Sequence, residues 1–399
     1  MERDFVGKKE FPIKCEIGRG LEGAIVNNTQ IGYVNGKEGR LCYRGISIED
    51  LAKYSSFEET AYLLLFGKLP KRDELNGFQE KLKVSRSIPQ GIVEMIKILP
   101  KDTHSMNLLM SAVAALAGYD KESQKVTLES EKEVAIRIIS KIATVTAAIS
   151  RIKKGKEVIE PREDLSHAEN LVYMITGEVD ESRPSLRGVD EEISKAIDMA
   201  LILHADHGMS GSTFTCMVIH ASLSDFYATI AGGIGSLKGP LHGGANERVI
   251  KMLQEIGTPS NVEEWYGRER KLHHKIPGFG HRIYHAYDPR ARIFKEYCHR
   301  VATTEEIKNL LAIAERLEEV EIRELGEKKG IFPNVDFYSG IVYKALGLET
   351  SLFTPLFAVA RVAGWTARVL EYMPENRIFR PRAEYYGPLK QEYIPMEKR

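Results

Sequence analysis

The sequence contains little cysteine. Its 399 residues include four, Cys15, Cys42, Cys216 and Cys298, and none of them forms a CxxC pair. This wide spacing disfavours both a zinc site and a disulfide framework, because each is usually marked by closely grouped cysteines. We therefore expect reduced thiols that pack in the interior of a cytosolic protein.

The sequence also has no excess of charge of one sign. Lys plus Arg and Asp plus Glu both number 56, which gives a formal net charge of zero at pH 7. A general nucleic-acid binder, or a protein that adheres to anionic membranes, carries an excess of basic residues. Neither class of partner is expected, and an anionic ligand would have to be bound by a local group of cations.

No stretch has the character of a targeting or membrane-spanning segment. The first residues, MERDFVGKKEF, lack the apolar run of a signal peptide and the acid-poor, Arg-rich composition of a transit peptide. The run 213–237 lacks Lys, Arg and Glu, but His220, Asp225 and three glycines interrupt it. Such interruptions favour buried helices over a bilayer span, so we expect a cytoplasmic protein with no membrane partner.

Helical periodicity dominates most of the chain. Apolar residues recur at helical spacing in stretches that proline and glycine separate, including 58–66, 106–116, 134–152 and 165–175. Residues 20–44 instead have strand-like composition and turn signals such as Asn35-Gly36. No glycine fingerprint follows a strand, which excludes a dinucleotide-binding or phosphate-loop unit. The pattern predicts a mainly α fold with a small N-terminal β-hairpin region.

The length of the chain predicts more than one domain. A chain of 399 residues is long for a single hydrophobic core, so two domains of unequal size are expected. Residues 305–329 are rich in charge but keep apolar residues at helical spacing, which predicts a surface helix with one solvated face.

The segment 275–290, KIPGFGHRIYHAYDPR, interrupts the helices twice. Pro277, Gly278 and Gly280 disfavour regular helix, so His281 is expected on an exposed loop of the kind that suits binding and chemistry. The Asp-Pro pair that follows favours extended backbone and leaves Arg290 to open the next helix. An ordinary turn between two helices would explain the same residues.

Two further segments contain histidine. In LHADH, His204 and His207 lie three residues apart on one helix face beside a carboxylate, which fits either metal ligation or a histidine directed at an anion; we favour the anion. In GPLHGGAN, His242 lies next to a predicted helix N-terminus, a position that lowers the pKa of an imidazole and favours its neutral form. Taken alone, His242 fits a structural role as well as a functional one.

Charged residues near the C-terminus leave similar alternatives. Asp336, in PNVD, precedes an apolar helix, and taken alone it is better explained as the N-cap of that helix than as a functional carboxylate. Arg361 lies within an apolar helical run, and a buried arginine needs an anion. The tail contains Arg380-Pro381-Arg382, which is either a rigid basic turn or a solvated end.

The order of these motifs along the chain resembles the citrate synthase family. The motifs are, in order, LHADH, GPLHGGAN, PGFGH followed by DPR, NVD, the arginine in an apolar helix, and the terminal RPR. The resemblance covers most of the chain. It implies a mainly α homodimer with a large domain made of residues 1–243 and 347–399 and a small domain of residues 244–346. Motion of the small domain would close the cleft over the substrates and exclude water.

The resemblance also implies the reaction. In this family acetyl-CoA, a co-substrate, is condensed with oxaloacetate and water to citrate and CoA through an enol and citryl-CoA, without a metal; the enzymes are acyltransferases of the tricarboxylic acid cycle. The motif match makes Asp336 the base that removes the methyl proton and His242 the donor to the thioester oxygen. By the same match His281 polarises the ketone of oxaloacetate.

The binding residues are likewise implied by the resemblance. Oxaloacetate would be bound by His207, Arg290, Arg361 and Arg380, the last reaching the active site of the other subunit. CoA would be bound by Gly278, Gly280 and His285 of the loop around His281. The nearby basic residues Lys271 and Lys275 are further candidates for binding CoA, although a solvated loop explains these two lysines as well. The sequence departs from the family pattern at Ser210, where asparagine is usual, and at His285, where Lys, Arg or Thr is usual.

Two alternatives remain open at the level of sequence. A 2-methylcitrate synthase would use propionyl-CoA, and one methylene is worth only about 1–3 kcal/mol in an apolar pocket. The second alternative is a catalytically silent helical protein that keeps the dicarboxylate site. The presence of all three residues matched to catalytic roles, His242, His281 and Asp336, argues against it. The nature of the product and of the acyl-CoA would discriminate among the three.

Overall fold

The computed structural model describes residues 19–21, 23–177, 191–381, 383 and 387–399. Helices make up most of this part of the chain, and the strands that it contains form one small antiparallel sheet near the N-terminus. The predicted fold class, mainly α with an N-terminal hairpin region, is confirmed.

The sheet has the order β1-β2-β3. β1 (Gly32–Asn35) and β2 (Arg40–Tyr43) form the predicted hairpin, with Gly32 opposite Tyr43 and Asn35 opposite Arg40. β3 (Ile46–Ser47) was not predicted, because two residues are too few to show an alternating pattern.

The helices follow in close succession. Their bounds are α1 Ile48–Tyr54, α2 Phe57–Phe66, α3 Arg72–Val84, α4 Gln90–Ile98, α5 Ser105–Leu116, α6 Leu128–Lys153, α7 His167–Thr176, α8 Glu191–His204, α9 Gly211–His220, α10 Phe226–Leu237, α11 Ala245–Ile256, α12 Val262–Lys271, α13 Pro289–Val301, α14 Glu305–Glu321, α15 Glu327–Lys329, α16 Val335–Ala345 and α17 Phe353–Tyr372.

The helix ends differ from the predicted stretches where a capping residue lies outside the apolar pattern. Thr127 caps α6 by accepting a hydrogen bond from the backbone N–H of Ser130, so α6 begins before the first predicted apolar residue, Val134. The extra turn carries Glu129, which the positive end of the helix dipole stabilises. Apolar periodicity detects only the part of a helix that packs on the core.

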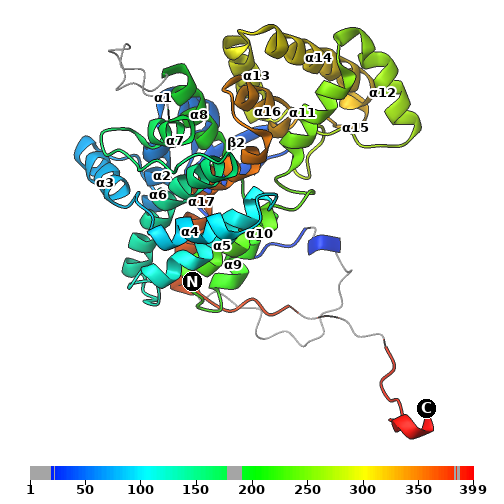
Figure 1. The fold of residues 1–399 in the computed structure, drawn as a ribbon. Coiled ribbons are helices and arrows are strands. Elements are labelled where there is room, and N and C mark those ends of the chain that lie inside the picture. Colours follow the sequence, from blue (N-terminus) through cyan, green and yellow to red (C-terminus); the bar gives the residue numbers. More distant parts are fainter. Residues whose placement is uncertain (1–18, 22, 178–190, 382, 384–386) are drawn as a thin grey trace.

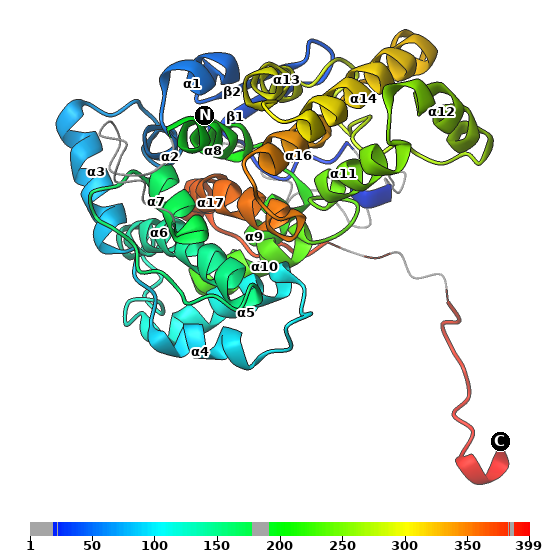
Figure 2. The ribbon, with the colours of Figure 1, turned by 45° about the horizontal axis from the view of Figure 1, so that its top comes forward.

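The helices of the first group surround α17, which is buried along nearly its whole length. Helices α2, α6, α8, α9 and α10 pack directly against it, and α5 lies beside α6 and α10. Figures 1 and 2 show α17 inside this layer of helices. Because the core is built around α17, the C-terminal part of the chain lies next to segments that precede it by more than a hundred residues.

Helices α11 to α16 form a second group, at the upper right of Figure 1. Within this group α16 packs against α11, α13 and α14, and α12 packs against α14. Contacts of α13 with α1 and α8, and of α11 with α17, connect it to the first group. The loop 272–288 connects α12 to α13, and it contacts the first group of helices through Tyr284, which lies beside His207.

The predicted surface helix at 305–329 is interrupted. α14 buries the predicted apolar positions, including Ile307, Leu310 and Leu317, but one π-helical turn, Ile322–Gly326, separates it from the short α15. One helix face is buried and most of the charged residues are exposed, as expected from the pattern, but Glu318 and Glu321 are buried.

No helix within the described ranges is long and apolar enough to cross a membrane. Cys42, Cys216 and Cys298 are free thiols, and the last two are buried; Cys15 lies outside the described residues. Beyond α17 the chain leaves the body of the protein, and its last residues lie far from the helices (Figure 1).

Candidate active site

His281 lies on the loop between α12 and α13, where Gly278 and Gly280 have φ angles of 82° and 77°. These left-handed conformations favour glycine and let the chain turn back on itself. The backbone N–H groups of Ile283 and Tyr284 both donate to His281 Nδ1, at 2.9 and 3.2 Å. Because Nδ1 accepts, the proton of the neutral ring is on Nε2.

His207 lies beside His281, with ring centroids 5.0 Å apart. Its Nε2 is 3.1 Å from the hydroxyl oxygen of Tyr284, so the loop that holds His281 also contacts His207. Burial, and next the charge of Arg290, hold the pKa of His207 well below its usual value. Burial likewise lowers the pKa of His281 to about 4, so both rings are neutral at neutral pH.

His242 follows α10 and is held by Ser212 from the first turn of α9. The backbone N–H of Ser212 donates to His242 Nε2 at 3.2 Å, and the Ser212 hydroxyl lies 2.8 Å from the same atom. The indole N–H of Trp365 donates to that hydroxyl at 3.3 Å. Nε2 is therefore an acceptor and the ring proton is on Nδ1. Burial and the charge of Arg361 lower the pKa of His242 to about 4.

Asp336 does not cap its helix. Asn334 is the N-cap of α16, since its side-chain oxygen accepts from the backbone N–H of Asp336 at 3.0 Å. The Asp336 carboxylate is buried, and its Oδ1 has no hydrogen-bond partner in the described structure. Burial raises the pKa of Asp336 to about 7, although the charge of Arg290 opposes this rise. The alternative of a purely capping aspartate is wrong.

Arg290 and Asp288 form a buried pair. The guanidinium Nε and Nη2 donate to the two carboxylate oxygens of Asp288, at 3.0 and 2.7 Å. Asp288 also caps α13 and accepts from the backbone N–H of Val335 at 3.2 Å. The DPR motif therefore connects the histidine loop to the first turn of α16, which carries Asp336.

Arg361 has no carboxylate bonded to it among the described residues. It is 1% exposed, its Nε donates to the backbone oxygen of His204 at 2.6 Å, and its guanidinium lies over the ring of Phe357. Burial lowers the pKa of Arg361 to about 10, which still leaves it charged at neutral pH. A buried positive charge of this kind is stabilised by a bound anion.

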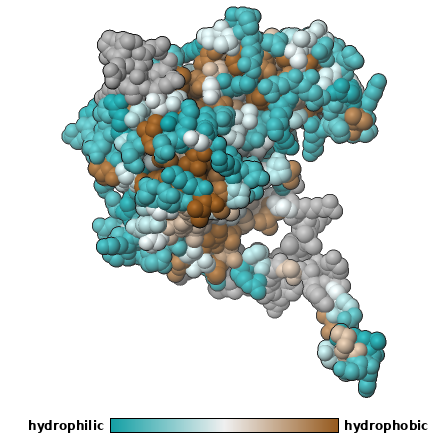
Figure 3. Space-filling view, in the orientation of Figure 1, coloured by the Kyte–Doolittle hydropathy of each residue, from teal (hydrophilic) through white to brown (hydrophobic). Residues whose placement is uncertain are grey.

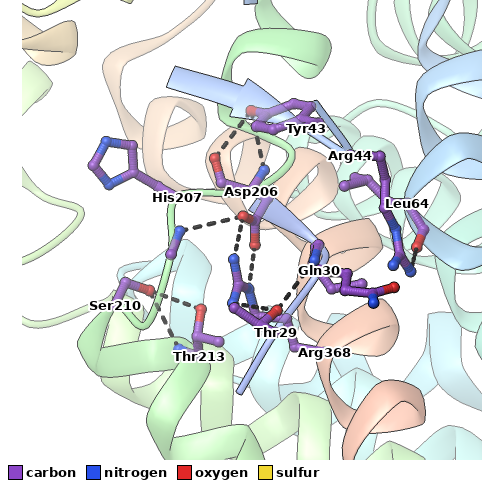
Figure 4. Close-up of polar contacts among 12 residues, drawn as sticks. Thr29, Gln30, Tyr43, Arg44, Leu64, Asp206, His207, Ser210, Thr213 and Arg368 are labelled. Carbon is purple, nitrogen blue, oxygen red and sulfur yellow. Dashed lines mark hydrogen bonds and ion pairs between the residues drawn. The ribbon is translucent and has the colours of Figure 1, made fainter. Parts of the chain in front are cut away.

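The LHADH segment has a second role that the sequence did not reveal. Arg368 Nε and Nη2 donate to the two oxygens of Asp206, at 2.8 and 2.7 Å, and both side chains are buried (Figure 4). Arg368 Nη1 also donates to the hydroxyl of Thr29, which donates to Glu371. Asp206 therefore fixes α17 and the strand-forming N-terminal segment to the loop that carries His207.

The two histidines of LHADH have separate environments. His204 Nδ1 donates to the backbone oxygen of Ala200 at 2.9 Å, and its ring packs on Phe294 and Phe357. His207 instead faces Tyr284. Across the described ranges no three His, Cys, Asp or Glu side chains are grouped as metal ligands.

Removal of the Asp206 carboxylate is expected to destabilise the fold strongly. In Asp206→Ala the Arg368 guanidinium stays buried without its counter-charge, which costs roughly 3–5 kcal/mol of unfolding free energy. Chemical denaturation measures this loss. The matched control is Glu133→Ala, which removes the exposed Lys81–Glu133 pair and is expected to cost less than about 1 kcal/mol. A loss of similar size in both variants would contradict the prediction.

Several predicted binding residues lie on the surface of this chain. Lys271, Lys275 and His285 are exposed. Arg380 is also exposed, and its Nη1 donates to the adjacent Pro381 oxygen at 2.9 Å. Six predicted site residues lie close enough for their charges to shift one another's pKa values; they are His207, His242, His281, Asp336, Arg290 and Arg361. The predicted CoA-binding cations and Arg380 do not belong to this group.

Ser210 is the N-cap of α9, because its hydroxyl accepts from the backbone N–H of Thr213 at 3.3 Å. Ser212 was missed by the sequence analysis, although it holds His242. The signal available was its place two residues after Ser210 at the start of a helix, which does not by itself indicate a histidine partner.

Comparison with known proteins gives one consistent family. A family model described as citrate synthase, C-terminal domain, matches residues 20–382. Citrate synthases of Deinococcus radiodurans and Saccharolobus solfataricus are 43% and 41% identical to this chain; each match covers 96% of this chain and 99% of the relative.

Solved structures agree with the sequence comparison. A citrate synthase from Thermotoga maritima matches with a TM-score of 0.85 and 42% identity, over 96% of this chain and 99% of its own. A citrate synthase from Thermoplasma acidophilum, solved as a ternary complex with carboxymethyl coenzyme A and oxaloacetate, matches with a TM-score of 0.89 and 35% identity, over 96% of this chain and 100% of its own.

Proposed function

The chain belongs to the citrate synthase family, and from this premise we propose that it condenses acetyl-CoA with oxaloacetate and water to form citrate and free CoA. The observation that carries the proposal is the buried Asp336 carboxylate, which has an unpartnered oxygen and a pKa raised to about 7. The same chain holds two neutral histidines, His242 and His281, whose ring protons are assigned by their hydrogen bonds. A base, two hydrogen-bond donors and buried arginines are the groups that an aldol-type condensation of a thioester requires.

The first step is removal of a proton from the thioester methyl group by Asp336. The enol that forms carries developing negative charge on the thioester oxygen, and His242 Nδ1–H donates to it. Ser212 and Trp365 keep His242 in this tautomer by occupying Nε2. A pKa of about 7 suits Asp336 to this step, because a base is most effective when its pKa is close to the working pH.

The second step joins the enol carbon to the ketone carbon of oxaloacetate. His281 Nε2–H donates to the ketone oxygen and transfers its proton there as the carbon bond forms, because the two backbone donors at Nδ1 leave the ring proton on Nε2. The proton that Asp336 took from the methyl group balances this transfer, so that Asp336 ends as a carboxylate and His281 regains its neutral form. Water then hydrolyses the resulting citryl thioester and releases CoA.

Oxaloacetate carries two carboxylates, and we assign them to the arginines. Arg361 supplies an uncompensated buried charge, and Arg290, already held by Asp288, presents its remaining N–H groups. His207 contributes a hydrogen bond nearby. The third cation is Arg380 of the partner subunit, since Arg380 is exposed on its own chain.

A homodimer is supported by the surface of three helices. Neither α5, α9 nor α10 contains a single Lys, Arg, Asp or Glu. Figure 3 shows apolar surface gathered over the region where Figure 1 places α5 and α10. An uncharged face of this extent suits burial against a second copy, which would bring each exposed Arg380 to the other active site.

We propose a large domain of residues 1–243 and 347–399 and a small domain of residues 244–346. The grouping of α11 to α16 supports this division. Closure of this small domain would carry Asp336 toward His242. We keep Lys271, Lys275, Gly278, Gly280 and His285 as the CoA-binding residues, and cytoplasmic location stays a prediction from the sequence.

The proposal is tested by following free thiol release with oxaloacetate and either acetyl-CoA or propionyl-CoA, and by identifying the product. Citrate formation with a preference for acetyl-CoA is the expected result. Preference for propionyl-CoA would indicate a 2-methylcitrate synthase, which the comparisons do not favour, and oxaloacetate binding without turnover would indicate a silent binding protein.

Ser210→Asn is expected to leave the fold intact. Asparagine caps a helix as well as serine does, so the melting temperature should not change, whereas Ser210→Ala loses the cap and about 1 kcal/mol. The longer amide also reaches further toward the site, so calorimetry should show oxaloacetate binding unchanged or tighter in Ser210→Asn. Much weaker binding would show that the site is built around serine.

A further inference from the structure

The β1–β2 hairpin is fixed at its base to the segment that carries His207. The hydroxyl of Tyr43 is 3.0 Å from the backbone oxygen of Asp206 and accepts from the Asp206 N–H at 3.2 Å. Gly32 lies so close to the same residue that a Cβ there would be 2.6 Å from Asp206 Oδ2. Figure 4 shows Tyr43 and Asp206 in this contact.

The tip of the same hairpin contacts the loop that carries His281. The backbone oxygen of Gly36 accepts from the N–H of His285 at 2.9 Å. A Cβ at Gly36 would overlap the backbone oxygen of Ile283, and a Cβ at Gly39 would lie 2.6 Å from the backbone oxygen of Tyr287. The turn therefore touches both ends of the segment 283–287 through positions where only glycine fits.

The segment under the tip is the one that orients both histidines. Its N–H groups at Ile283 and Tyr284 hold His281 Nδ1, and the Tyr284 hydroxyl meets His207 Nε2. The turn itself is stiffened by Asn35, whose side-chain oxygen accepts from two backbone N–H groups of the turn at 3.1 and 3.2 Å.

We propose that the hairpin is a strap that sets the position of His281 relative to His207, and that Gly36 and Gly39 are positioning residues for the condensation. This inference rests on the proposed function. In the proposed domain division the strap runs from the large domain to a loop of the small domain. Its tip contact therefore fixes the position of His281, which polarises the ketone, relative to His207 of the large domain. Neither glycine belongs to the groups assigned to the substrates.

The test begins with Gly36→Ala. The added methyl group must push the turn away from Ile283, and a displacement of about 1 Å at the histidine loop is expected to lower kcat/KM for oxaloacetate by roughly 10²-fold. The KM for acetyl-CoA should change less than the KM for oxaloacetate. The matched control is Gly45→Ala, which has a φ of 87° and nothing within 4 Å, and which should lose stability but keep both kinetic constants.

A second variant keeps the test decisive if Gly36→Ala does not fold. Replacement of residues 36–39 by Asn-Gly gives a two-residue turn that preserves the pairing of Asn35 with Arg40 and removes the tip contact. It should show the same kinetic loss. The proposal would be overturned if folded tip variants kept the wild-type kcat/KM for oxaloacetate. It would also be overturned if Gly45→Ala lowered kcat/KM as much as the tip variants do.

Hydrogen exchange separates this inference from the function itself. Amides of the segment 283–285 should exchange faster in both tip variants than in the wild type and in Gly45→Ala, whether or not the protein turns over. Absence of citrate formation by the wild type would refute the proposed function alone. Unchanged exchange in the tip variants would refute the strap alone.

Discussion

Asp336→Ala is expected to lower kcat by roughly 10³- to 10⁴-fold while leaving oxaloacetate binding nearly unchanged. The variant loses the base that acts on the thioester methyl, whereas the dicarboxylate is assigned to other side chains. Thiol release measures the first effect and calorimetry with oxaloacetate the second. The matched control is Asp225→Ala, since Asp225 caps α10 and its loss should cost stability without this loss of rate. Loss of binding together with activity would contradict the assignment of Asp336.

The pH dependence of the wild type should report the same residue. Asp336 acts as a carboxylate, and its pKa is raised to about 7, so kcat/KM for acetyl-CoA should fall as the pH is lowered below about 7. The groups His242 and His281 have pKa values lowered to about 4 and stay neutral across this range. A profile that is flat between pH 6 and 8 would contradict this prediction.

Asp336→Asn should also be more stable than the wild type at neutral pH. In the unfolded chain the carboxyl ionises near its ordinary pKa of 3.8, but in the folded protein burial delays ionisation to about 7. The folded state therefore holds an extra proton between these values, and Asp336 lowers the free energy of unfolding as the pH rises through this window. Above it the difference amounts to up to about 4 kcal/mol. Denaturation of both proteins at pH 4 and pH 7.5 measures this.

Mixed dimers of Asp336→Ala and Arg380→Ala are expected to regain activity that neither homodimer has. If Arg380 of the partner subunit completes each site, a mixed dimer has one site with both groups intact and one with neither. Random pairing makes about half of the dimers mixed, and one of their two sites works, so about a quarter of wild-type activity should return. Co-refolding at equal concentrations, followed by thiol-release assays, measures the recovery.

The control for this experiment is the mixture of Asp336→Ala with His281→Ala. Both residues belong to one chain's share of the site, so this mixture should stay inactive under the same proposal. Differential tagging establishes that mixed dimers have formed. Their presence without recovered activity would place Arg380 outside the site of the partner subunit.

The sequence by itself determined the local features of this protein. Proline and glycine set the loops that carry His242 and His281, and apolar periodicity located the buried faces of helices such as α5 and α14. The neighbours of Arg361 in the sequence also showed that it lies in an apolar run and, if buried, needs an anion. These features depend on residues within a few positions of one another, which a sequence displays directly.

Tertiary structure alone decided which groups meet and in which chemical form. Asp206 and Arg368 are 162 residues apart and pair only because α17 passes the LHADH loop. The ring protons of His242 and His281 are placed by backbone donors of Ser212 and of the loop. Asp336 gains its raised pKa because the packed helices remove water from its carboxylate. Desolvation and long-range contacts arise from the whole fold, so no local pattern contains them.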